Sequence, residues 1–129
     1  MEKYEDAQSK LLDDLRQVYT QALHVYQDLD PNRLKLGFRE AMFIVTSRLF
    51  GEKLCPNVSI DPYGEYIFSH MSKMGYVDIG VRGEGELSYH VRNDVNPGET
   101  RFDDYKWEDN DFKIPIDLSK ALKSLEQQL

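Results

Sequence analysis

Apolar residues recur every three or four positions through the first 51 residues. Over residues 5–30 this spacing places seven apolar side chains on one stripe, as in an amphipathic α-helix. Asp30 followed by Pro31 is typical of a helix start, because the carboxylate caps free N–H groups and proline lacks an N–H. A second stripe runs to Gly51, where a left-handed residue would end the helix. The pattern predicts two antiparallel helices joined by a tight turn.

After Pro56 the period of the pattern changes from helical to two. Alternation begins at Val58, continues past a turn at residues 61–64, and resumes on each side of the glycine-containing turn at residues 83–85. It is typical of antiparallel strands with one apolar and one polar face. The residues predicted on the core face include Tyr66, Phe68, His70, Val77, Ile79, Val81, Leu87, Tyr89 and Val91. Those predicted on the open face are Asp78, Arg82, Ser88, His90 and Arg92.

The last third of the chain contributes an edge strand and a closing helix. A turn at residues 96–98 precedes a short strand expected near residues 102–107, and Asp117 is the expected N-cap of the helix. The predicted fold class is α+β, with one domain over residues 1–129. It consists of a helical hairpin (1–51) packed on an antiparallel meander of four to five strands (56–113) and a short C-terminal helix (117–128).

Negative charge is concentrated in residues 93–111. This segment holds seven acidic and two basic residues, a net charge of −5 against −7 for the whole chain, and the only tryptophan. An acidic surface with aromatic anchors suits a basic partner protein. The alternative is a solvated loop whose charges maintain solubility and whose aromatics pack into the core. The residues predicted to bind a partner are Asp103, Asp104, Tyr105, Trp107, Glu108, Asp109 and Asp111.

Composition restricts the function classes. The isoelectric point near 4.9 argues against binding nucleic acid directly through its phosphates. No apolar run approaches the roughly 20 residues that span a bilayer, so no membrane partner is expected. The single cysteine, Cys55, cannot form an internal disulfide, and the N-terminus has no signal-peptide pattern, so a cytoplasmic location is expected. The oligomeric state stays open.

The three histidines are the first candidates for catalysis, because imidazole titrates near neutral pH. His24 lies outside the apolar stripe of the first helix, as an ordinary surface or boundary residue would. His70 falls on the core face, whereas His90 shares the open face with Ser88 and with Asp78, the carboxylate that would orient an imidazole. A paired histidine site is therefore not favoured.

The sequence gives little support for a thiol nucleophile, a metal site or a phosphate-binding loop. Nothing near Cys55 has the spacing of a thiol nucleophile with its base or of a zinc site. The acidic pairs of the charged segment lack the ligand spacing of a calcium loop. Gly80, Gly83 and Gly85 join two strands and precede no helix, so hairpin geometry explains them better than phosphate binding. We expect no enzyme activity, no cofactor and no metal.

The meander resembles one common in small bacterial antitoxin-like and immunity-type proteins. The resemblance rests on residues 56–70 (PNVSIDPYGEYIFSH), 77–81 (VDIGV) and 85–89 (GELSY), about a quarter to a third of the chain, and excludes the helical half. That pattern often has a tryptophan where this chain has His70. The proteins most similar are immunity proteins of contact-dependent growth-inhibition systems. The resemblance implies a non-enzymatic protein that binds and blocks a toxin domain.

The first hypothesis is therefore an immunity or antitoxin protein that binds a cognate toxin, favoured as a basic nuclease, through the acidic segment. Tyr105 and Trp107 would supply the apolar anchors. Two alternatives stay open. One is a small enzyme that uses His90 with Asp78, Ser88 or Arg92, and the other is an adaptor that self-associates through the first helix, near Leu15 and Val18.

Overall fold

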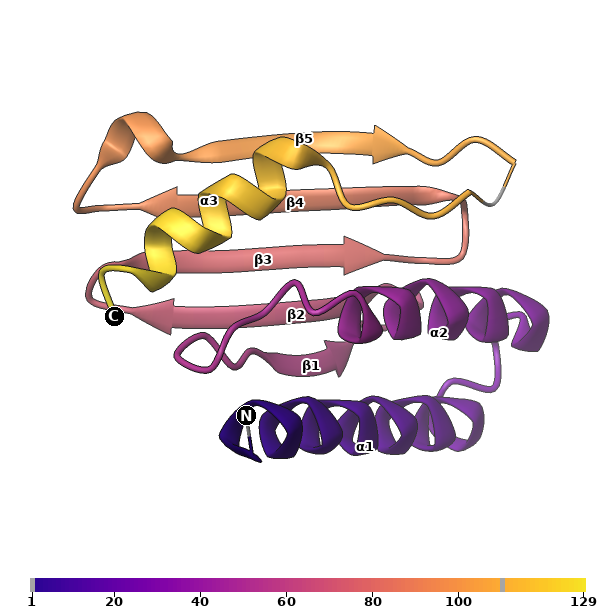
Figure 1. Ribbon diagram of the computed structural model, residues 1–129. Helices are drawn as coiled ribbons and strands as arrows, with labels where there is room; N and C mark the ends of the chain where they lie inside the picture. Colours follow the sequence, from indigo (N-terminus) through magenta and orange to yellow (C-terminus); the bar gives the residue numbers. More distant parts are fainter. Residues whose placement is uncertain (1, 110) are drawn as a thin grey trace.

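The computed structural model describes residues 2–109 and 111–129. The fold is α+β: α2 and α3 lie on one face of a five-stranded antiparallel sheet, and α1 lies beside α2 along the β1 edge (Figure 1). The elements are α1 (Glu2–Val25), α2 (Pro31–Thr46), β1 (Asn57–Ile60), β2 (Tyr66–Ser72), β3 (Gly75–Val81), β4 (Glu86–Asn93), the short 3₁₀ helix η1 (Pro97–Glu99), β5 (Arg101–Lys106) and α3 (Ile116–Glu126). The predicted combination of helical hairpin, meander and closing helix is confirmed.

The sheet is a simple meander in which each strand pairs with the next, in the order β1-β2-β3-β4-β5. Its register places Phe68 opposite Ile79 and Ile79 opposite Tyr89, so these three side chains share a face. All three are buried beneath the helices. The two faces predicted from the alternation are therefore confirmed for β2, β3 and β4.

The N-terminal end of α2 is fixed by two contacts. Asp30 caps the helix by accepting a hydrogen bond from the backbone N–H of Asn32, as predicted. The phenol of Tyr66 donates to the carbonyl of Leu34 (2.9 Å), which ties the first turn of α2 to β2. A single core then joins helices and sheet, with Leu15, Ile44, Phe68, Ile79, Leu118 and Leu125 among its fully buried members.

The ends of the helices differ from the prediction. Helix α2 ends at Thr46 and not at Gly51, because the hydroxyls of Thr46 and Ser47 bond to carbonyls of the last turn. The left-handed residue that follows is Arg48 (φ 61°). Helix α1 ends at Val25, and α3 begins at Ile116 with Pro115 as its N-cap, so the expected cap Asp117 lies inside the first turn.

Candidate functional site: the open face of the sheet

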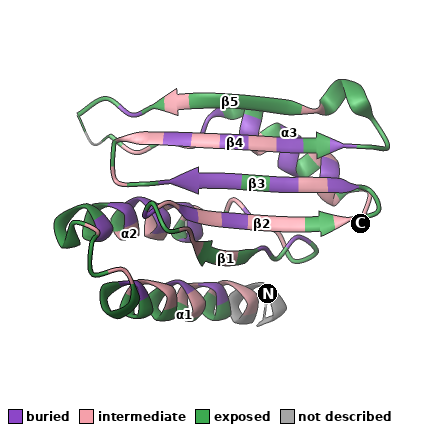
Figure 2. Cartoon of the chain, turned by 180° about the vertical axis from the view of Figure 1, so that it is seen from behind, coloured by how far each residue is buried: buried purple, intermediate pink, exposed green. Residues whose placement is uncertain are grey.

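One face of the sheet carries none of the helices in residues 2–109 and 111–129 (Figure 2). Cross-strand pairing arranges its side chains in rows. One row contains Ser69, Asp78, His90 and Phe102, and the next contains Ile67, Gly80, Ser88 and Asp104. We call the surface formed by these two rows, together with Glu65, Tyr76, Arg82 and Arg92, the open face.

The centre of the open face is hollow, because Gly80 has no side chain and its neighbour Ser88 has a small one. The depression has a volume of about 460 Å³. Carboxylates from three strands or their flanks surround it, namely Glu65, Asp78 and Asp104. A Cβ atom at Gly80 would stand 2.8 Å from the Glu65 carboxyl carbon, so glycine is what allows this carboxylate to lie over the sheet.

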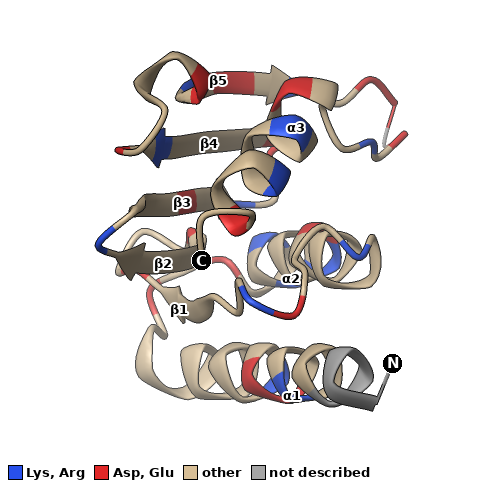
Figure 3. Ribbon diagram, turned by 60° about the vertical axis from the view of Figure 1, so that its left-hand side comes forward, with Lys and Arg blue, Asp and Glu red and all other residues tan. Residues whose placement is uncertain are grey.

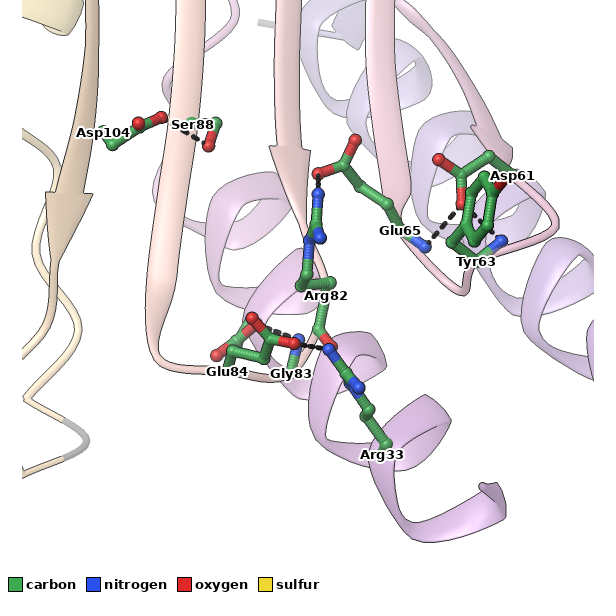
Figure 4. A network of polar contacts seen from close by, with 10 residues as sticks. Arg33, Asp61, Tyr63, Glu65, Arg82, Gly83, Glu84, Ser88 and Asp104 are labelled. Atoms are coloured by element: carbon green, nitrogen blue, oxygen red, sulfur yellow. Dashed lines mark hydrogen bonds and ion pairs between the residues drawn. The ribbon is translucent and has the colours of Figure 1, made fainter. Parts of the chain in front are cut away.

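The carboxylates around the depression differ in their partners (Figure 4). Glu65 forms an ion pair with Arg82 (2.9 Å), and its carboxylate raises the pKa of that guanidinium. Asp104 accepts a hydrogen bond from the Ser88 hydroxyl (2.7 Å), a neutral donor. Within residues 7–109 and 111–129, neither Asp78 nor Asp104 has a basic side chain within ion-pair distance. The depression therefore keeps negative charge that this part of the chain does not neutralise.

An aromatic group borders the acidic depression on the side of β5. The Tyr76 hydroxyl lies 2.6 Å from His90 Nδ1, and the ring of His90 meets that of Phe102 edge-on. Phe102 is 74% exposed although it is large and apolar. On the other side Arg92 stacks over the Tyr76 ring at 4.6 Å and pairs with Asp94. An apolar ring thus stands in solvent next to unneutralised carboxylates.

The polar groups of the open face are not connected as a nucleophile and its base. The Ser88 hydroxyl is bonded to Asp104 and not to His90, and Nδ1 of His90 is engaged by Tyr76. Asp78 is cross-strand neighbour to His90 but no hydrogen bond joins them. Serine activation needs hydroxyl, imidazole and carboxylate in one chain of hydrogen bonds. The described residues hold the three groups on one face without that chain.

Trp107 is not an exposed anchor, and the prediction that it is one is wrong. Its side chain is 7% exposed and packs against Phe43 and Phe112, and its indole N–H donates to the Lys113 carbonyl (2.7 Å). The indole is enclosed because the chain folds back over it after β5 and closes an aromatic cluster. Tyr105 is half-buried on the helix side. The alternative interpretation, a core tryptophan, holds for this residue.

The acidic segment is divided among several surfaces (Figure 3). Asp104 belongs to the open face, whereas Asp103 is opposite Tyr89 on the helix side and adds to the burial that raises the pKa of the Tyr89 phenol. Glu108, Asp109 and Asp111 follow β5 in a loop, and Asp111 pairs with Lys113. The predicted partner-binding residues therefore share a neighbourhood but not one face.

Two side chains that line the acidic depression, those of Phe102 and Glu65, were missed from the sequence. Phe102 was not among the predicted binding residues, although the two-residue period of β5 places it on the face of Asp104. Glu65 precedes β2 and its place over Gly80 has no signal in the periodicity. The alternation in β5 could have identified the first residue, but only the packed structure identifies the second.

The remaining candidates stay isolated. His24 and Cys55 are exposed, and His70 lies on the helix side with a buried Nε2 that has no hydrogen-bond partner among the described residues. Across residues 2–109 and 111–129, no group of three or more His, Cys, Asp or Glu side chains is placed to hold a metal ion. No helix in those ranges is long and apolar enough to cross a membrane.

Comparisons with known proteins leave the open face without a described counterpart. No family model matches the chain, and neither the curated proteins nor the solved structures contain a significant match.

Proposed function

We propose that this chain is an immunity or antitoxin protein that binds a cognate toxin, of the basic nuclease class, and blocks it stoichiometrically. The observation that carries the proposal is the acidic depression of the open face, where Asp78 and Asp104 lack cationic partners among the described side chains and Phe102 is exposed beside them. The resemblance of the meander to immunity-type proteins points in the same direction.

The charge of the open face is complementary to that of a nuclease. A nuclease presents a cationic surface to its substrate, so an acidic protein that covers this surface excludes the nucleic acid. Unneutralised carboxylates increase the rate of association by steering, while a desolvated aromatic anchor supplies most of the binding free energy. In this role Phe102 replaces the buried Trp107, and the open-face carboxylates oppose Lys or Arg of the toxin.

The test is co-expression with the product of the adjacent upstream open reading frame, followed by affinity capture at low and high salt. The informative variant is Asp78→Asn/Asp104→Asn, which keeps the shape of the depression and removes two charges. Its matched control is Asp13→Asn/Asp28→Asn, which changes the net charge equally at exposed positions of α1 and the turn that follows it.

The expected result is one stoichiometric partner whose affinity falls about tenfold or more with the open-face variant and little with the control. High salt should weaken the wild-type complex more than the open-face variant, because the variant has fewer charges to screen. Recovery of no stoichiometric partner at either salt, or equal loss in both variants, would contradict the proposal.

A Phe102→Ala variant tests the aromatic anchor in the same assay. Truncating a central anchor typically costs on the order of 2 kcal/mol of binding free energy. We expect this loss at both salt concentrations, because the contact is apolar. Unchanged affinity would place the toxin on another surface.

A further inference from the structure

The sheet ends in two edge strands of different character. The edge at β1 is four residues long and α1 packs against it. At the opposite edge, β5 has six residues, five of them exposed. In Figures 1 and 2 no other helix or strand of the described residues lies beyond β5. One edge of the sheet is therefore covered, and the other offers unpaired backbone groups to solvent.

The register identifies these unpaired groups. Trp107 donates its backbone N–H to the Gly85 carbonyl (2.8 Å), so this cross-strand pair is a hydrogen-bonded one. It shows which residues of β5 form hydrogen-bonded pairs with β4. Because hydrogen-bonded pairs alternate in antiparallel strands, the backbone groups of residues 101, 103 and 105 face β4, and those of 102, 104 and 106 face outward. A second contact agrees, since the Asp104 N–H is bonded to the Asp103 side chain (2.8 Å) and not to β4.

The charge pattern of β5 selects the kind of strand that can be added. The sequence of β5, Arg-Phe-Asp-Asp-Tyr-Lys, has a basic residue at each end, two acidic residues in the middle and an aromatic residue between them on each side. Because residues 102, 104 and 106 face outward, two copies paired antiparallel about the middle of β5 would be centred on Asp103 or on Asp104, and that aspartate would oppose its counterpart in the other copy. Like charges directly opposite destabilise a sheet. A second copy of this chain is therefore disfavoured, and a strand with two central cations flanked by apolar residues is the complement.

We infer that β5 is the docking edge for the toxin, which adds a strand with a central pair of basic residues to this sheet. The inference rests on the proposed function and names the segment of the toxin that would be recognised. Backbone hydrogen bonds would form at Phe102, Asp104 and Lys106, the partner's cations would face Asp103 and Asp104, and its apolar residues would face Phe102 and Tyr105.

Asp103 acts as a removable cap in this scheme. In the free protein its carboxylate occupies the N–H of Asp104, which satisfies the middle of the open edge. An arriving cation attracts that carboxylate, and the released N–H then donates to a carbonyl of the added strand. The same side chain thus protects the edge from unspecific pairing and selects a basic partner.

The first experiment uses the full-length protein and a synthetic probe, the blocked peptide Thr-Val-Lys-Arg-Val-Thr. The control peptide Lys-Thr-Val-Val-Thr-Arg has the same composition and charge in the wrong order. We expect saturable shifts of the amide NMR signals of residues 102, 104 and 106 with the first peptide only. Amide exchange at these residues should slow by about tenfold or more, because added hydrogen bonds protect them. Equal binding of both peptides, binding elsewhere, or no binding would overturn the inference.

The second experiment compares Lys106→Pro with Lys106→Ala. Both remove the same charge, but only proline removes the outward N–H, and proline is tolerated at an edge strand. We expect Lys106→Pro to bind the probe peptide about three- to tenfold more weakly than Lys106→Ala, the effect of one hydrogen bond. If both variants bind the co-expressed toxin equally, strand addition is wrong and the proposed function stands. Failure to recover any toxin refutes the proposed function separately.

Discussion

Glu40 is the one acidic residue that is buried within residues 7–109 and 111–129. It lies in the middle of α2 and is 4% exposed, and its two carboxylate oxygens accept hydrogen bonds from the N–H groups of Gly83 (2.7 Å) and Gly85 (2.8 Å). It therefore holds the turn between β3 and β4 against the helix. The sequence could not show this, because a glutamate after an exposed arginine in an amphipathic helix is typical of a solvent-facing position.

Substitution of Glu40 by alanine should destabilise the fold markedly. The change leaves two turn N–H groups without an acceptor and opens a cavity beside them. We expect the free energy of unfolding in urea to fall by on the order of 2–4 kcal/mol. Arg39→Ala, at the adjacent exposed position, should change it by less than about 0.5 kcal/mol. Similar values for both variants would contradict the role of Glu40.

The titration of Glu40 gives a second, independent prediction. Burial raises the pKa of its carboxyl above the ordinary value of 4.5, and the two backbone hydrogen bonds oppose this shift only in part. The folded state thus binds the proton more tightly than the unfolded chain, so protonation of Glu40 stabilises the fold. As pH rises from 4.5 through the raised pKa, this contribution is lost. The free energy of unfolding of the wild type, minus that of Glu40→Gln, should therefore fall over this interval and then level off. A difference that rises with pH would refute the assignment.

The two aromatic residues Phe102 and Trp107 should respond in opposite ways to truncation. Trp107→Ala removes the centre of a packed cluster and should cost about 3–5 kcal/mol of stability. Phe102→Ala removes an exposed ring and should change stability by less than about 0.5 kcal/mol while weakening toxin binding. Thermal unfolding of the two variants, side by side, checks this. A stable Trp107→Ala protein would reopen its role as a surface anchor.

At the scale of elements, the turn between β3 and β4 and the helix α2 approach each other closely through glycines. Gly83 has φ 78°, and a Cβ there would stand 2.6 Å from the Arg33 carbonyl oxygen and 2.8 Å from the Gly37 nitrogen. On the helix, Gly37 similarly makes room for the Tyr66 ring. Gly37 lowers the helix propensity of α2 locally, yet the two glycines allow the contact that Glu40 then fixes.

Two glycine substitutions test whether the close approach at Gly83 stabilises the fold, beyond the flexibility that any turn glycine provides. Gly83→Ala adds a left-handed strain and a backbone clash, so we expect a loss of at least about 2 kcal/mol. Gly98→Ala, in η1, has nothing within 4 Å of the new Cβ and should be neutral or slightly stabilising. Urea unfolding of both proteins gives the comparison. Equal effects would show that the close approach at Gly83 is not required.

The elements themselves were largely readable from the sequence, because periodicity reports which side chains face the core. The alternation from Tyr66 to Val91 sorted both sheet faces correctly, and Asp30 marked the start of α2. Boundaries were less readable. The end of α2 at Thr46 depends on hydroxyls that bond to the last carbonyls, and such local competition leaves no periodic signal.

At the scale of the whole molecule, α2 and α3 cover one face of the sheet and α1 flanks its β1 edge, which leaves the other face free of the described helices (Figure 2). The sequence predicted that face but not its shape, because the depression depends on Glu65, which precedes β2, lying over Gly80 of β3. The sequence also grouped Trp107 with the acids, since charge along the chain does not report how a loop folds back. The periodicity of apolar residues could not predict these contacts between segments that are distant in the sequence.

The same arrangement decides what the first helix can do. Self-association through Leu15 would need this side chain at the surface, but it is fully buried in the core. Leu15→Ala should therefore lower the free energy of unfolding by about 2–5 kcal/mol without changing how the mass in solution depends on concentration. Leu23→Ala, on the same helix and 39% exposed, should cost less than about 1 kcal/mol. Light scattering and urea unfolding on both variants test this directly. A change of mass without a loss of stability in Leu15→Ala would mean that α1 leaves the core to form an interface. In that case the helical side, and not the open face with its β5 edge, would be the interaction surface of the protein.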